Sequence, residues 1–81
     1  MALVGKIYDM QTDDLRLEIE MAAKEYRESH PASSYLRVFV NPADSQPRLP
    51  RDLQLSDGST ILVLLTHTVI PGKLCVSNQV S

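Results

Sequence analysis

The sequence predicts an α+β fold, in which one amphipathic helix packs on a small, mostly antiparallel sheet of three to five strands in the order β-α-β-β-β. One stretch, 13–29, places apolar residues at helical spacing, and several later stretches are β-prone and separated by turn residues. The 81 residues leave room for one hydrophobic core. We therefore expect a single domain over residues 1–77, followed by a polar tail over 78–81.

The first two predicted elements are a short strand and the helix. Residues 3–8 alternate loosely in hydropathy, which indicates a strand. Thr12 is suited to cap the helix, and Asp13 and Asp14 favour its positive end. Pro31 ends the helix, because a proline disfavours helical geometry at the residue before it. The stripe expected to face the core consists of Leu15, Ile19, Ala22 and Tyr26.

Leu17 and Met21 form a second apolar feature of the helix. They lie one turn apart, roughly 200–240° round the helix axis from Leu15. Single exposed apolar residues need no explanation, so these two are either ordinary surface residues or part of a contact surface for a partner. The sequence leaves both readings open.

The middle of the chain predicts a strand, a stiff loop and a turn. Residues 35–41 alternate, with Val38 and Val40 on one face and Arg37 and Phe39 on the other. Prolines stiffen the loop 41–52, and residues 53–55 form a short strand. Gly58 supplies the positive φ of the turn that follows.

The stretch 60–70 is strongly β-prone, and its centre, 61–65, is apolar on both faces. Such a strand lies in the middle of a sheet with both faces covered, or at an interface. Pro71-Gly72 predicts a type II turn, after which residues 73–76 would return as the second arm of a hairpin. Across that hairpin His67 would approach Cys75, although a single buried cysteine is usually only a small core residue.

Charge is distributed unevenly along the chain. The helical region carries nine charged residues between positions 13 and 28, whereas residues 53–81 contain only Asp57 and Lys73. One helix covers only one face of a sheet, so the apolar strand needs a further cover. That cover is either another part of this chain or a partner, and a second copy is one candidate. The interface residues that we predict are Leu17, Met21, Ile61, Val63 and Leu65.

The composition indicates no catalytic, cofactor or metal site. His30 and His67 are too few for a metal centre, and neither has a second ligand at a suitable spacing. There is no glycine-rich phosphate loop and no convergent set of polar residues, so we expect the protein not to be an enzyme and to need no cofactor.

The net charge of −2 and the pI near 5.5 argue against nucleic-acid binding. A weak basic patch of Arg37, Arg48 and Arg51 is the one feature in favour of it. No apolar run approaches the ~20 residues of a membrane helix. No signal peptide is evident either, so we expect an intracellular, cytoplasmic protein without a membrane partner.

Residues 36–64 resemble the second half of a β-grasp domain, as in ubiquitin-like sulfur carriers and TGS-type domains. The matching residues are Val40-Asn41 and Leu55-Ser56-Asp57-Gly58-Ser59, the latter placed before an apolar strand. The resemblance implies a β-grasp-like fold. A β-grasp domain opens with a full hairpin, however, and sulfur carriers end in Gly-Gly, whereas this chain ends in Asn78-Gln79-Val80-Ser81. No functional residue is therefore carried over.

These observations favour a non-catalytic protein-interaction module that self-associates or serves as a subunit of a larger assembly. The alternatives are a small regulatory or carrier-like component of an enzyme system and a weak single-stranded nucleic-acid binder.

Overall fold

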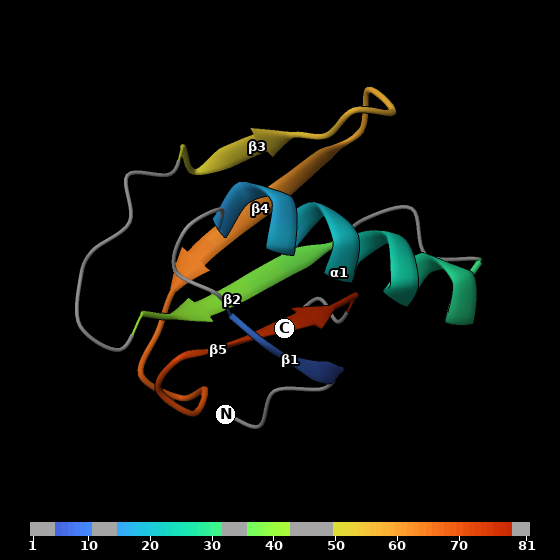
Figure 1. The fold of residues 1–81 in the computed structure, drawn as a ribbon. Coiled ribbons are helices and arrows are strands. Elements are labelled where there is room, and N and C mark those ends of the chain that lie inside the picture. The colour runs from blue at the N-terminus through green and yellow to red at the C-terminus, as the bar shows by residue number, and fades with distance from the viewer. Residues whose placement is uncertain (1–4, 11–14, 32–35, 43–49, 79–81) are drawn as a thin grey trace.

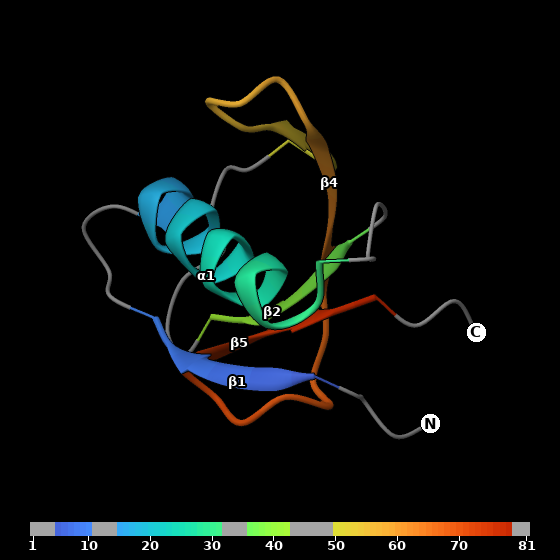
Figure 2. The ribbon, with the colours of Figure 1, turned by 90° about the vertical axis from the view of Figure 1, so that its right-hand side faces the viewer.

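The computed structural model describes residues 5–10, 15–31, 36–42 and 50–78 (Figure 1). The elements in chain order are β1 (Lys6–Asp9), α1 (Leu15–Ser29), β2 (Arg37–Asn41), β3 (Asp52–Gln54), β4 (Thr60–Leu65) and β5 (Lys73–Ser77). The five strands form one sheet in the order β1-β5-β2-β4-β3. Helix α1 lies on one side of this sheet (Figure 2). The predicted α+β class is confirmed.

The sheet is mixed rather than purely antiparallel. The pairs β1–β5, β5–β2 and β4–β3 are antiparallel, and the central pair β2–β4 is parallel. Parallel strands need a crossover connection, and the segment between β2 and β4, which includes β3, provides it. The sheet is therefore mostly antiparallel, as predicted, but apart from β3 and β4 its neighbouring strands are not consecutive in the chain.

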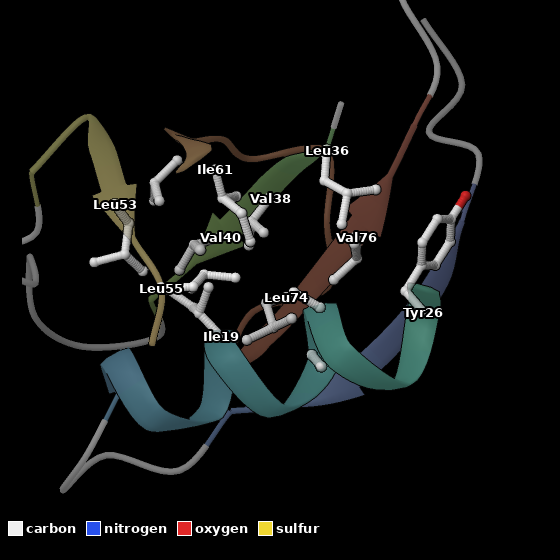
Figure 3. Close-up of a cluster of buried hydrophobic side chains, with 13 residues drawn as sticks. Ile19, Tyr26, Leu36, Val38, Val40, Leu53, Leu55, Ile61, Leu74 and Val76 are labelled. Carbon is white, nitrogen blue, oxygen red and sulfur yellow. The ribbon is translucent and has the colours of Figure 1, made fainter. Parts of the chain in front are cut away.

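The hydrophobic core lies between α1 and the sheet (Figure 3). The helix contributes Ile19, Ala22, Ala23 and Tyr26, with Leu15 packed against the cluster, so the predicted stripe is confirmed. The sheet and the turn after β3 contribute Leu36, Val38, Val40, Leu53, Leu55, Ile61, Val63, Leu74 and Val76. Each fully buried aliphatic side chain contributes about 1.5–3 kcal/mol, so this one cluster is the main source of stability.

Helix α1 ends at Ser29, two residues before Pro31, as predicted. The His30 N–H donates to the Tyr26 carbonyl at 2.9 Å, and the two rings stack with centroids 4.1 Å apart. The Tyr26 hydroxyl donates to Asn78 Oδ1 at 3.0 Å, which ties the end of the helix to the residue after β5. The predicted capping residues of this helix, Thr12, Asp13 and Asp14, lie outside the described residues.

The predicted hairpin is wrong, although its turn is present. Gly72 has a φ of +80°, and the Lys73 N–H donates to the Ile70 carbonyl at 3.0 Å, as in a tight turn. Strand β4 ends at Leu65 rather than at residue 70, and β5 pairs with β1 and β2 instead of β4. The turn reverses the chain, but β2 occupies the edge of β4 that a hairpin partner would need.

Candidate functional site

The two faces of the sheet differ in what covers them. Side chains alternate along each strand, and the face that carries Val38 and Val40 packs against α1. Among the described residues no helix lies on the opposite side (Figure 2). We call that side the open face. Its strand residues are Ile7, Asp9, Arg37, Phe39, Asn41, Asp52, Gln54, Thr60, Leu62, Leu64, Lys73, Cys75 and Ser77.

An apolar row crosses four strands of the open face. The register places Ile7 beside Cys75, Cys75 beside Phe39, and Phe39 beside Leu64. Ile7 is 47 % exposed, Phe39 and Leu64 are half-buried, and only Cys75 is fully buried. Leu62, also half-buried, extends the row on β4. The surface opposite the helix therefore carries a continuous apolar row, of which Ile7, Phe39, Leu62 and Leu64 are at least partly exposed.

The segment after β4 folds against one end of the open face. The Asn41 side chain donates to the Val69 carbonyl at 2.5 Å, and the Gly72 N–H donates to the Asn41 carbonyl at 2.8 Å. Val69 is buried although it lies in an irregular segment. Burial raises the pKa of the Cys75 thiol, which keeps the thiol protonated at neutral pH and disfavours its use as a nucleophile.

The charges on the open face are balanced. Asp9 and Lys73 form an ion pair on one side of the apolar row. Arg37 and Asp52 lie on the other side, each next to Leu62 in the register. The described strand residues of this face thus carry two cations and two anions.

Three of the predicted interface residues are exposed. Leu17 and Met21 are 50 % and 59 % exposed on α1, and Leu65 is 52 % exposed at the end of β4. The placement of Ile61 and Val63 on an outer surface is wrong, because both belong to the core beneath α1. Side chains alternate along a strand, so the apolar residues of β4 that reach the open face are Leu62 and Leu64.

The predicted basic patch is not assembled as expected. Arg48 lies outside the described residues. Arg37 is on the open face of β2, whereas Arg51 directly precedes β3, and β4 lies between these two strands. The hairpin expected to bring His67 to Cys75 is not formed, because β5 pairs with β1 and β2, and Cys75 is buried whereas His67 is exposed.

Sequence reasoning did not name Leu62, Leu64, Phe39 and Ile7 as interface candidates. The signal that could have identified these residues is the presence of Phe39 on the same side of its strand as Arg37. It shows that this side is not purely solvated.

Within the described residues, no group of three or more His, Cys, Asp or Glu side chains is placed to hold a metal ion. No helix there has the length and apolar character needed to cross a membrane. Comparisons with protein-family models, with curated proteins and with solved structures find no match for this chain. The β-grasp resemblance therefore stays a prediction.

Proposed function

We propose that this protein is a non-catalytic interaction module that associates with a second copy of itself through the open face. The observation that carries the proposal is the apolar row of Ile7, Cys75, Phe39 and Leu64 on the side of the sheet that α1 leaves uncovered. A sheet whose second face is apolar can bury that face by packing against another layer, and sheet-on-sheet packing is a common solution.

The charges favour a second copy as the occupant. A two-fold dimer brings the same surface patch together from both subunits, so a patch with net charge repels its own copy. The open face carries Asp9 and Lys73 on one side of the row and Arg37 and Asp52 on the other, which sum to zero. The solvent side of α1 is less suited, because four glutamates and three basic residues leave it with a net negative charge.

Light scattering on a sizing column at several protein concentrations tests this proposal. We expect a mass of twice 9.0 kDa that falls only on dilution. Leu64→Lys places one charge in each subunit at the centre of the contact and should give a monomer. Leu64→Thr removes apolar area without adding charge, introduces a β-branched residue that suits a strand, and should weaken association less.

The matched control is the double variant Leu17→Glu with Met21→Lys, which changes two residues of similar exposure on α1. It should remain a dimer. Circular dichroism and urea unfolding confirm that each variant is folded. A wild-type protein that stays monomeric at every concentration contradicts the proposal, as does a monomeric helix variant beside a dimeric Leu64→Lys.

A further inference from the structure

Strand β1 is an edge of the sheet with outward-facing backbone groups. In the described part of the chain it pairs only with β5. The Met10 N–H donates to the Gly72 carbonyl at 3.1 Å, and this pair continues the β1–β5 register. In an antiparallel pair, hydrogen-bonded and non-hydrogen-bonded positions alternate. Tyr8 therefore bonds inward to β5, whereas the N–H and C=O groups of Ile7 and Asp9 point outward.

A groove runs along the helix side of this edge. It lies between β1 and α1 and has a volume of about 400 Å³. Tyr8, Met21 and Ala22 provide its apolar lining, and Met21 is 59 % exposed. The Tyr8 hydroxyl oxygen is buried and has no hydrogen-bond partner in the part of the chain that the structure describes. A side chain entering the groove would therefore meet the apolar surface of Tyr8, Met21 and Ala22.

The groove is acidic. Three glutamates line it, Glu18, Glu25 and Glu28, against the single ammonium group of Lys24. Glu25 is neutralised by an ion pair with Lys6 at 2.6 Å. Asp9 also borders the groove, but its carboxylate pairs with Lys73 on the open face. Glu18 and Glu28 form no ion pair with any described residue. A cationic side chain is the complement of this groove.

We infer that the β1 edge binds an extended segment of a different polypeptide in which basic and apolar residues alternate. The segment adds a strand to the sheet by hydrogen bonding to the outward groups of Ile7 and Asp9. Its alternate side chains point to opposite faces. The basic set enters the groove toward Glu18 and Glu28, and the apolar set lies beside Ile7. This inference does not rest on self-association through the open face, because the edge and the groove are present in one copy.

The other edge of the sheet is less suited to strand addition. Strand β3 has three residues, and Pro50 lies two residues before it. Proline cannot donate a backbone hydrogen bond and protects an edge from pairing. The β1 edge has no proline.

A capped peptide of alternating Lys and Val tests the inference, with an alternating Glu and Val peptide as control. Each peptide is titrated into the millimolar range against ¹⁵N-labelled protein, and amide shifts are followed by NMR. We expect the Lys peptide to bind, with the largest shifts at Ile7 and Asp9, and the Glu peptide not to bind. Added salt should weaken the binding.

Two substitutions at one position separate strand addition from simple charge attraction. Asp9→Pro removes an outward N–H while leaving the bonds of Tyr8 to β5, and should weaken binding about tenfold. Asp9→Ala removes the same carboxylate but keeps the N–H, and should weaken binding by no more than about threefold. The double variant Glu18→Gln with Glu28→Gln should also weaken binding, whereas Glu20→Gln, on the other flank of α1, should not.

Equal affinities for Asp9→Pro and Asp9→Ala would show that the edge is not used and would overturn the inference. So would the absence of binding by the Lys peptide, or equal binding of the two peptides. Leu64→Lys, which tests the proposed dimer, should bind the Lys peptide as the wild type does. Failure of one proposal is thereby distinguishable from failure of the other.

Discussion

The side-chain amide of Asn41 donates a 2.5 Å hydrogen bond to the backbone carbonyl of Val69, and both residues are buried. This bond joins the last residue of β2 to the irregular segment that follows β4. Asn41→Ala leaves the carbonyl buried without that donor, which should cost about 1–3 kcal/mol of unfolding free energy. Urea unfolding measures the loss, and hydrogen exchange should quicken over residues 66–72.

The matched control lies in the same segment. The hydroxyl groups of Thr66 and Thr68 form a 2.9 Å hydrogen bond in an exposed position. Thr68→Ala should change the unfolding free energy by less than about 0.5 kcal/mol, since exposed sites are tolerant. An Asn41→Ala variant no less stable than Thr68→Ala would show that the Asn41 bond does not hold the segment.

Gly58 has a φ of +89° in the turn between β3 and β4, and no atom lies within 4 Å of the Cβ that a substitution would add. The cost of Gly58→Ala is therefore backbone strain alone, about 1–2 kcal/mol. Gly58→Asn should cost less, because asparagine tolerates positive φ. Thermal unfolding of the two variants provides the comparison, and an equal loss in both would contradict the strain account.

Stability should fall at alkaline pH. Burial raises the pKa of Cys75, so the folded protein holds the thiol proton more tightly than the unfolded chain does. Above the ordinary pKa of a thiol, the unfolded chain releases that proton first, and the unfolding free energy declines until pH exceeds the raised value. The pKa values of Lys6, beside Glu25, and of Tyr8, by burial, are also raised and act in the same direction.

Urea unfolding from neutral pH to about pH 10.5 covers the range in which the thiol and the phenol of the unfolded chain lose their protons, and the contribution of Lys6 is lost only above it. Cys75→Ala removes one of the three contributions, so its stability should depend less steeply on pH than that of the wild type. A variant with the same slope as the wild type would show that the thiol does not contribute.

The hydrogen bond from the Tyr26 hydroxyl to Asn78 Oδ1 is part-buried and joins positions far apart in the chain. Tyr26→Phe keeps the ring in the core and removes only this donor, with an expected loss of about 1 kcal/mol. A double-mutant cycle with Asn78→Ala isolates the pair. A coupling energy near zero would mean that the bond does not stabilise the fold.

Local sequence patterns predicted the helix well. Ile19, Ala22 and Tyr26 recur at helical spacing, and Pro31 stops the pattern, so neither the buried stripe nor the end of α1 depends on distant contacts. The turn at Gly72 could also be predicted from neighbouring residues alone, because proline and glycine fix its backbone angles.

The features that the sequence did not reveal depend on contacts between residues far apart in the chain. The stretch 61–65 is apolar at every position, so hydropathy alone cannot say whether Ile61 or Leu62 faces α1, and a shift of one residue exchanges the two faces. The insertion of β2 between β4 and β5 likewise depends on which strands bury each other's side chains. The predicted interface residues Ile61 and Val63 were wrong for the same reason, because the face of Ile61 decides which residues of β4 lie on the open face.

The pairing of Lys6 with Val76 brings the two ends of the described chain together (Figure 1). Consequently β1 emerges from the ribosome long before the strand that completes its ladder. The nascent chain must keep β1 unpaired until β5 has been synthesised, and contacts between such distant residues form slowly. A circular permutant that joins the ends with a short linker would make this contact local, and it should refold faster than the natural order of strands.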